Sequence, residues 1–425
     1  MDLKQGSSTP AAARRRMNDV ARGTSPLQFR DFRLVWIGFF VSQFGTQMQV
    51  VAVSWQVYQL TGDPLALGAI GLARILPVLL FGVFGGMVAD VVDRRRMLLC
   101  AQTGLLLNSL GLSYLTYEGL VTMPILYSFC VLGGTAAALS NPARQAMIPT
   151  LVSEEALPRA LGLSVSSWQF ATVLGPTVGG ILLGAYSASL VYLIDATSFV
   201  AMIIALLLIR SRGAAAPTTE VGLAAVAEGF RFLWKTPILL GLMLADFLGT
   251  FFAGAMLLMP IFANELLNVG PTGLGLLFAA PAAGSMLVAL GIAVIGSPPL
   301  RGATVLICIG LYGLSTAAFG VTSSFGLALL FLALGGVADG ASTVVRQTLR
   351  QLLTPDHLRG RMTGVTMIFF MGGPQLGELE AGAAARLFGV RASVILGGIL
   401  CTVSAAALSA VLPGLRRYRL HGTPP

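Results

Sequence analysis

Long apolar runs dominate this sequence and restrict the folds that it can adopt. Each run is long enough to cross a bilayer, because a helix that rises about 1.5 Å per residue needs roughly 20 apolar residues for a ~30 Å hydrocarbon core. With 55% apolar and only 11% charged residues over 425 positions, the chain is not an ordinary soluble protein. We therefore predict an all-α membrane protein with twelve transmembrane helices. The expected spans are 34–60, 65–89, 97–117, 121–139, 161–184, 190–209, 238–262, 273–295, 302–321, 325–345, 362–385 and 392–412.

Basic residues are distributed unevenly between the two sides of this membrane. Of the 27 Lys and Arg residues, 24 fall in the N-terminal tail 1–33, in the C-terminal tail 413–425 or in the loops on the same side. Arg386 and Arg391 fall on the opposite side, and Arg74 falls inside a span. The positive-inside rule then places both termini in the cytoplasm. We expect a multi-pass protein of the bacterial cytoplasmic (inner) membrane. The net charge of +9 follows from this topology and from contact with anionic membrane lipid, so no nucleic-acid partner is expected.

The chain divides into two similar halves. A hydrophilic linker, 210–236, separates a six-span bundle at 34–209 from a second at 237–412, and its part Val226–Trp234 has the pattern of an amphipathic helix on the membrane surface. Short pieces of the first half recur in the second, which is typical of transporters built from two parallel repeats with a site between them. The recurring pieces are Leu132-Gly133-Gly134 and Leu334-Gly335-Gly336, Arg144-Gln145 and Arg346-Gln347, and Pro64-x-x-Leu67-Gly68 and Pro271-x-x-Leu274-Gly275.

A short loop with two carboxylates and three arginines follows the second span. It reads Gly86-x-x-x-Asp90-x-x-Asp93-Arg94-Arg95-Arg96. This spacing resembles the loop motif between the second and third helices of the major facilitator superfamily. The resemblance implies that Asp90 holds the two halves together while the transporter faces outward. It also implies that Arg144 contacts Asp90 and that Arg94 anchors the loop.

Three further stretches sharpen this resemblance. They are Asp31-Phe32-Arg33-Leu34-Val35-Trp36, Leu60-Thr61-Gly62-Asp63-Pro64-Leu65-Ala66-Leu67-Gly68 and Leu358-Arg359-Gly360-Arg361-Met362-x-Gly364. They are similar to the superfamily branch that contains the enterobactin exporter and macrolide efflux pumps. The resemblance implies a monomeric secondary active transporter with no cofactor, which exports a drug-like or siderophore-like small molecule by alternating access in exchange for protons. An importer or a lipid-handling facilitator on the same scaffold is the alternative, and a membrane enzyme or receptor is a second, although no catalytic motif is present.

Several charged residues lie inside the apolar spans, where insertion costs about 2.5–3.5 kcal/mol each. Arg74 and Glu378 stand at the same depth, because each lies roughly 25 Å from the basic side of its helix at 1.5 Å per residue. The resemblance to the superfamily implies that the second and eleventh helices face each other across the seam between the halves. We therefore predict that Arg74 and Glu378 form an ion pair that closes the side opposite the basic residues. Glu380 is about 200° from Glu378 around the helix, so only one of these two carboxylates can face a central cavity.

Proton coupling requires a carboxylate in an apolar setting that is exposed to each side of the membrane in turn. Asp246 is the first candidate and Glu378 the second. Asp339 lies seven residues before Arg346 on the same helix face, so we expect a structural ion pair there. Asp195 is expected close to the outer surface as a solvated carboxylate. The two histidines, at positions 357 and 421, lie in a loop and in the tail, and the four cysteines have no spacing that indicates a disulfide or a metal site.

Polar residues in the first span form a stripe on an otherwise apolar helix. Such a stripe faces protein or water rather than lipid, since lipid cannot satisfy hydrogen-bonding groups. Together with polar residues of the fifth span and phenylalanines of the seventh and eleventh, it predicts an amphipathic cavity for a bulky substrate. Core packing with hydrogen bonds between helices is the alternative. The predicted cavity residues are Gln43, Gln47, Ser54, Tyr58, Trp168, Gln169, Thr172, Phe251, Phe369 and Phe370.

Overall fold

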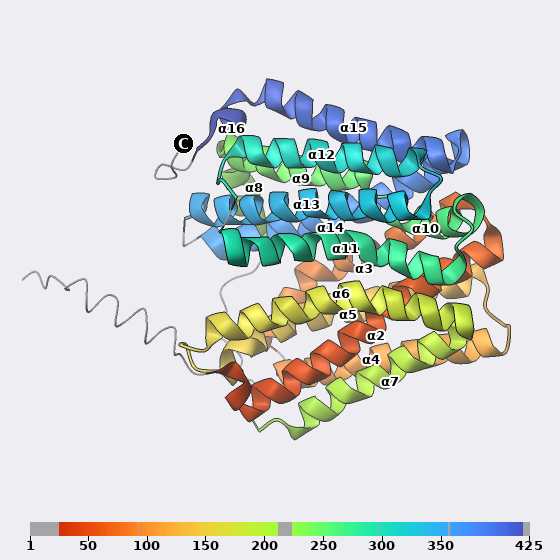
Figure 1. Cartoon of the computed structure of the whole chain (residues 1–425). Coiled ribbons are helices and arrows are strands. Elements are labelled where there is room, and N and C mark those ends of the chain that lie inside the picture. The colour runs from red at the N-terminus through yellow and green to blue at the C-terminus, as the bar shows by residue number, and fades with distance from the viewer. Residues whose placement is uncertain (1–24, 92, 211–222, 297, 356–357, 420–425) are drawn as a thin grey trace, which may run out of the picture.

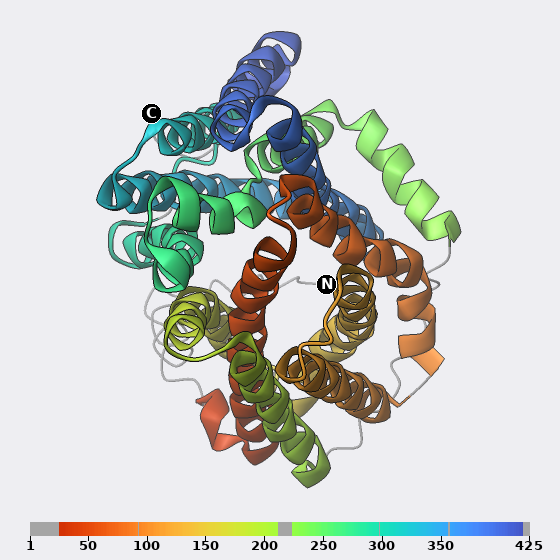
Figure 2. The same cartoon turned by 90° about the vertical axis from the view of Figure 1, so that its right-hand side faces the viewer.

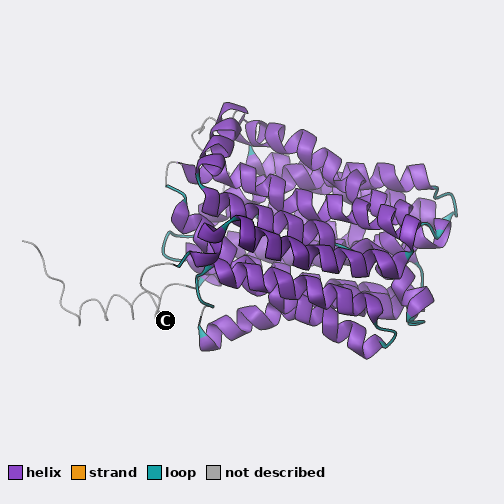
Figure 3. Ribbon diagram, turned by 90° about the horizontal axis from the view of Figure 1, so that it is seen from above, coloured by secondary structure: helices purple, strands orange, loops and turns teal. Residues whose placement is uncertain are grey.

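The structure of the protein is a computed structural model that describes residues 25–91, 93–210, 223–296, 298–355 and 358–419. The side chains of residues 78–91, 142, 223–226, 359–361, 363–364 and 367 lie outside this description, as do both histidines. Within the described ranges the chain forms helices joined by loops (Figure 3). One isolated β-bridge joins Arg301 and Arg419. The elements are η1 (Pro26–Gln28), α2 (Arg30–Thr61), α3 (Pro64–Val91), α4 (Arg94–Tyr117), α5 (Met123–Leu151), α6 (Leu157–Ala185), α7 (Ala188–Leu208), α8 (Leu223–Lys235), α9 (Pro237–Ala253), η2 (Met256–Leu258), α10 (Met259–Ile261), η3 (Phe262–Leu266), α11 (Gly270–Ile295), α12 (Gly302–Val321), α13 (Phe325–Leu353), α14 (Arg359–Phe388), α15 (Val390–Val411) and α16 (Pro413–Arg417).

Ten helical segments of the described chain are long and apolar enough to cross a membrane. The continuous run Pro237–Leu266, from α9 to η3, counts as one of them. α3 and α14 correspond to the other two of the twelve predicted spans, one in each half of the chain. α14 is less apolar because it contains Gln375, Glu378 and Glu380. The prediction of an all-α membrane fold is confirmed.

The spanning helices form two groups (Figure 1). Helices α2–α7 lie together in the lower part of that view, and α9–α15 lie in the upper part. α2 begins and α16 ends at the same end of the bundle, which we call the basic end because Arg94, Arg95, Arg416 and Arg417 lie there. We call the opposite end the far end.

The helix bounds repeat between the two groups. α5 and α13 have the same length and are shifted by 202 residues, and α2 and α9 begin 207 residues apart. These are the two shifts found in the recurring sequence pieces. Phe39 of α2 and Asp246 of α9 are therefore equivalent positions, as are Arg144 of α5 and Arg346 of α13.

The seventh span differs from its prediction as one continuous helix over 238–262. α9 ends at Ala253. The rest of the span consists of Gly254, the short elements η2 and α10, and the π-helix η3, with which the span ends at Leu266. Gly254 adopts φ −82° and ψ 73°, which is not helical. Pro260 lies in the first turn of the short α10, where its missing backbone N–H costs no helical hydrogen bond.

The seam between the two groups is closely packed toward the far end. α3 packs against α14 and α6 packs against α11. A Cβ added to Gly180 would lie 2.7 Å from the Cα of Gly275, and one added to Gly382 would lie 3.0 Å from the Cα of Gly68. These two crossings are equivalent under the 202- and 207-residue shifts. Only glycine permits such close helix contact, so the far end is sealed by backbone packing.

The predicted amphipathic helix Val226–Trp234 is present as α8, which lies beside α9 and α14 at the basic end. In the end-on view of Figure 2, α8 is seen along its length at the edge of the bundle, in light green. Its residues Phe230 and Leu233 pack against Leu239, Met243 and the side of α14. α8 therefore lies across the bundle rather than along it.

Candidate functional site

A buried ionic cluster lies in the basic half of the second group. The Nη2 atom of Arg346 lies 2.8 Å from Asp246 Oδ1 and 3.4 Å from Asp339 Oδ1. The side chains of Arg346 and Asp246 are only 9% and 14% exposed. Arg346 also donates hydrogen bonds to the hydroxyls of Ser342 and Thr343, at 2.9 and 2.8 Å. The predicted Asp339–Arg346 pair is confirmed, but Arg346 shares its charge with a second carboxylate.

The Asp246–Arg346 pair was not predicted, because the expected span ended just before Arg346. α13 instead continues to Leu353, so Arg346 lies about 10 Å inside its helix at 1.5 Å per residue. Asp246 lies nine residues into α9, about 13 Å from its start on the same scale. The similar depth of these two opposite charges is the feature of the sequence from which the pair could have been predicted.

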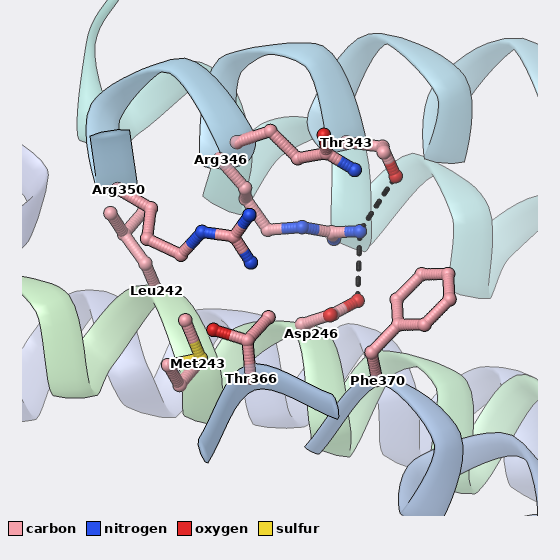
Figure 4. Close-up of a pocket in the computed structure, with 9 residues that line it drawn as sticks. Leu242, Met243, Asp246, Thr343, Arg346, Arg350, Thr366 and Phe370 are labelled. Carbon is pink, nitrogen blue, oxygen red and sulfur yellow. Dashed lines mark hydrogen bonds and ion pairs between the residues drawn. The ribbon is translucent and has the colours of Figure 1, made fainter. Parts of the chain in front are cut away.

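A pocket surrounds this ion pair (Figure 4). Polar side chains of α13, including Arg350, face Asp246 and apolar side chains of α9 and α14 across it. Such a lining offers charge, hydroxyls and an aromatic ring to an amphipathic small molecule. The lining residues are Leu242, Met243, Asp246, Thr343, Arg346, Gln347, Arg350, Thr366 and Phe370.

The equivalent position in the first group has a different partner. Arg144 lies over the ring of Phe39, with 3.9 Å between the guanidinium carbon and the ring centroid. Phe39 therefore takes the place that Asp246 has in the second group. A cation–π contact of this kind stabilises by about 0.5–2 kcal/mol and binds no proton. Of these two equivalent positions, only Asp246 can exchange a proton.

Glu378 lies in the seam between the groups. Its Oε2 atom is buried without a hydrogen-bond partner, 2.7 Å from where a Cβ on Gly71 of α3 would stand. Arg74, one turn further along α3, is close enough to interact electrostatically with Glu378 and with Cys130 of its own group. The ion pairs within 4.0 Å in the described chain do not include Arg74 with Glu378. Their pairing as a gate stays a prediction, as does the role of the half-buried Glu380.

Polar contacts join the two groups at the far end. The hydroxyl of Tyr58 donates to Glu265 Oε1 at 3.0 Å and accepts from the amide of Asn264 at 2.8 Å. Arg386 of α14 lies 3.7 Å from Asp63, which precedes α3. Both contacts link a residue of the first group to one of the second, so they have to break when the far end opens.

The predicted polar stripe of α2 is divided between different surroundings. Gln47 donates a hydrogen bond to Thr172 Oγ1 of α6 at 3.3 Å, and Gln43 is half-buried. Ser54 is fully buried and donates to the carbonyl of Val51 in its own helix, which fits the packing alternative rather than a cavity lining. Tyr58 lies at the far-end contact described above.

The remaining predicted cavity residues are also spread out. Gln169 of α6 donates to the carbonyl of Ala282 in α11 at 3.0 Å, across the seam, and Trp168 beside it is exposed. Phe370 lines the Asp246 pocket. Phe369 turns away from that pocket and packs in a cluster with α8, because neighbouring residues of a helix point about 100° apart.

Phe251 stacks on Phe247, with ring centroids 5.8 Å apart, and contacts α14 at Gly377. It is not among the residues that line the Asp246 pocket. Whether Phe251 contacts a substrate stays a prediction.

Asp195 corrects a prediction. It was expected near the outer surface in contact with water, but it is 0% exposed between α2, α4 and α7. Ser109 donates a hydrogen bond to its Oδ2 at 2.7 Å, and Gln49 donates to Ser109 at 3.0 Å. The error arose because distance along a helix gives depth in the membrane, whereas neighbouring helices decide whether water reaches that depth.

The motif after the second span is described only in part. The side chains of Gly86 and Asp90 lie outside the described residues, so their predicted roles stay predictions. Asp93 caps α4 by accepting a hydrogen bond from the backbone N–H of Arg95 at 2.9 Å. Arg94 is buried and donates to the carbonyl of Ala146 in α5 at 3.0 Å, and Arg95 donates to the carbonyl of Leu207 in α7 at 2.9 Å.

Groups of His, Cys, Asp and Glu that could hold a metal ion are absent from the part of the chain that the structure describes. The side chains that line the Asp246 pocket can bind a small molecule and exchange a proton at Asp246. No residue of the pocket is placed beside a base as a nucleophile would be.

Comparison with protein families and known proteins gives a consistent result. A family described as transmembrane secretion effector matches residues 21–418. The multidrug efflux pump Tap of Mycolicibacterium fortuitum is 28% identical over 395 residues, which cover 89% of this chain and 95% of that protein. The enterobactin exporter EntS of Salmonella choleraesuis (strain SC-B67) is 27% identical over 399 residues, which cover 93% of this chain and 94% of that protein.

Solved structures share the fold at lower sequence identity. A bacterial homologue of the human lysosomal transporter Spinster, inward-facing and unoccupied, superposes with a TM-score of 0.74 at 15% identity and covers 93% of this chain and 99% of that chain. A bacterial homologue of the iron transporter ferroportin, also inward-facing, gives 0.68 at 17% identity and covers 90% and 99%.

Proposed function

Because the chain belongs to the transmembrane secretion effector family of the major facilitator superfamily, whose members are membrane transporters and not enzymes, we propose that it exports a small molecule in exchange for protons. The substrate class is drug-like or siderophore-like, as the names of the efflux pump Tap and the enterobactin exporter EntS indicate for those relatives. The transporter acts as a monomer that draws on the proton gradient and needs no cofactor.

The orientation follows from the distribution of charge. The basic end faces the cytoplasm, since loops rich in Lys and Arg are retained on that side. Both termini are then cytoplasmic, and the far end faces the periplasm. The closely packed seam at the far end and the pocket in the basic half together favour an inward-facing state.

The buried Asp246–Arg346 pair is the observation that carries the proton-coupling proposal. An ionised Asp246 satisfies Arg346, and protonation releases Asp246 from the pair, so proton binding changes the charge of the pocket. A substrate that contacts the same pocket competes with this exchange. Mutual exclusion of proton and substrate at one site is the thermodynamic requirement for antiport.

Glu378 is the second candidate for proton coupling. Its Oε2 atom is buried without a hydrogen-bond partner, so an ionised Glu378 in the closed seam depends on the charge of Arg74, because an unpaired buried charge costs several kcal/mol. Opening of the far end separates α3 from α14 and exposes Glu378 to the periplasm. The two carboxylates thus lie on the opposite halves of the transport path.

Reconstitution in liposomes with an imposed pH gradient tests the proposal. A panel of antibiotics and catechol siderophores is first screened for binding by thermal stabilisation of the purified protein, and the compounds that bind are then assayed for transport. Asp246→Asn should abolish pH-driven export, while thermal stabilisation by the same compounds is retained.

Asp339→Asn is the matched control, since it removes the other carboxylate that contacts Arg346 but leaves the Asp246–Arg346 pair intact. Its transport should stay within about threefold of the unmodified protein, which corresponds to less than about 0.7 kcal/mol. Unchanged pH-driven export by Asp246→Asn rejects Asp246 and directs attention to Glu378→Gln. Inward movement under the same gradient favours the importer alternative.

A further inference from the structure

Helix α8 presents charged and aromatic side chains outward beside the pocket-forming helices. We propose that α8 docks on anionic phospholipid of the cytoplasmic leaflet and that this contact is transmitted to the Asp246 pocket through a chain of phenylalanine rings. The inference goes beyond export itself, and it requires only that the basic end faces the cytoplasm.

The two faces of α8 differ in their surroundings. Gly229 is buried, and Leu233 and the ring of Phe230 pack in one cluster with residues of α9 and α14. On the other face, Arg231 and Lys235 are exposed, four residues apart and therefore on one side of the helix. α8 lies across the bundle at its edge (Figure 2), and the proposal places this second face at the membrane surface.

The exposed face matches an anionic bilayer surface in its chemistry. Trp234, which is 70% exposed, lies on the helix between Arg231 and Phe230, and Trp is the side chain that prefers the headgroup level of a bilayer. Glu228 shares this face and has an interaction of its own. Because Arg231 and Lys235 are both basic and Glu228 is the acidic residue beside them, the charge of this face is net positive. A basic residue at this level favours anionic over neutral lipid by about fivefold.

α8 is tightly joined to the helix that carries Asp246. Only Thr236 separates the end of α8 from the start of α9, and its N–H donates to the carbonyl of Leu233 at 3.1 Å. Leu233 packs in one cluster with Met243, and Met243 also lines the Asp246 pocket. A displacement of α8 therefore acts on the pocket through α9.

A chain of aromatic rings forms the second connection. The ring of Phe230 in α8 lies 6.4 Å from that of Phe369 in α14, which lies 6.1 Å from that of Phe247 in α9. Phe247 is the neighbour of Asp246 in the sequence, and Phe369 is the neighbour of Phe370, which lines the pocket. Ring pairs at 4.5–7 Å transmit packing changes because they fit together in few geometries.

The lipid preference is tested on the full chain in lipid nanodiscs. The other three tryptophans are replaced by phenylalanine, so that Trp234 is the only fluorophore of its kind, and a tenth of the lipid is brominated phosphatidylglycerol or brominated phosphatidylcholine. Quenching should indicate a phosphatidylglycerol preference of about five- to 25-fold. The double substitution Arg231→Gln and Lys235→Gln should bring this preference close to one.

Arg416→Gln with Arg417→Gln is the matched control, because it removes two exposed arginines from α16 at the same end of the bundle. This control should leave the preference unchanged. Equal quenching by both lipids, or a preference that survives the α8 substitutions, overturns the lipid assignment. Absence of quenching by either lipid places Trp234 outside the bilayer and favours a soluble partner instead.

The transmission to the pocket is tested by thiol reactivity, so its failure leaves the export proposal untouched. Thr366→Cys, in a chain without other cysteines, places a thiol in the pocket wall, and a water-soluble maleimide reports its accessibility. The labelling rate should change at least threefold when phosphatidylglycerol is added to phosphatidylcholine nanodiscs. Phe230→Leu, which keeps an apolar side chain but removes the ring, should abolish this response.

Phe232→Leu is the control, since its ring is on the same helix and forms no ring pair in the described part of the chain. The lipid response should persist in that variant. A response of equal size in Phe230→Leu overturns the aromatic connection, and no response in the unmodified chain overturns the transmission as a whole. Trp234 quenching in each variant verifies that α8 is still docked.

Discussion

Gly180 offers the sharpest test of how the seam closes. A Cβ at this position would lie 2.7 Å from the Cα of Gly275 and 2.7 Å from the carbonyl oxygen of Pro271. Carbon atoms normally approach to about 3.5–4.0 Å, so the helices have to separate by close to 1 Å. Overpacking of this kind costs about 1–3 kcal/mol. α6 and α11 belong to different halves, so Gly180→Ala imposes this cost only on the state with a closed far end.

The expected consequence is a shift toward the outward-open state. A free-energy change of 1–3 kcal/mol alters the equilibrium by about five- to 150-fold. Gln169→Cys, in a cysteine-free chain, reports the shift, because Gln169 contacts Ala282 across the seam. A membrane-impermeant maleimide added from the periplasmic side should label this cysteine at least fivefold faster when Gly180→Ala is also present.

Gly162→Ala is the matched control on the same helix. A Cβ there meets no atom within 4 Å, so the substitution gives the same gain in helix propensity without the steric cost. Its labelling rate should equal that of Gln169→Cys alone. Equal rates in the Gly180→Ala and Gly162→Ala chains would refute the reasoning that glycine packing holds the far end closed.

Arg74→Glu should abolish transport in liposomes, because Arg74 and Glu378 are predicted to pair and close the far end. The double variant that also carries Glu378→Arg should restore part of the transport. A double variant as inactive as Arg74→Glu alone counts against the ion pair. Tyr58→Phe removes the hydroxyl that binds Glu265 across the far end, which costs about 0.5–1.5 kcal/mol of the closed state. Labelling of the seam cysteine should then rise about two- to tenfold, and an unchanged rate contradicts a latch. Asp195→Ala should destabilise the fold by about 1–3 kcal/mol in thermal unfolding, because the buried hydroxyl of Ser109 loses the acceptor of its proton, whereas Asp195→Asn keeps an acceptor and should cost less than half as much. Equal losses in the two variants contradict this account.

The candidate site shows where inference from the sequence succeeds and where it stops. Asp246 and Glu378 were identifiable because a carboxylate in an apolar run is expensive wherever the run is placed. The partner of Asp246 was missed, because it depends on which helices are neighbours. Arg346 and Arg144 occupy equivalent positions in the repeat, yet one meets a carboxylate and the other a phenyl ring.

The predicted cavity residues illustrate the same limit. Gln47, Ser54 and Tyr58 share one stripe along α2, but they contact α6, their own helix and η3 respectively. A stripe gives the direction of a side chain around one helix. It does not give the identity of the neighbouring helix at each depth.

Membrane insertion, the number of spans and the duplicated halves are therefore readable in the chain itself, since apolar length and repeated spacing are properties along one dimension. The break after Ala253, the burial of Asp195 and the sealed crossing at Gly180 depend on contacts between residues far apart in the chain. In a bilayer every helix already satisfies its own backbone hydrogen bonds, so close packing and a few buried polar groups are left to select which helices meet.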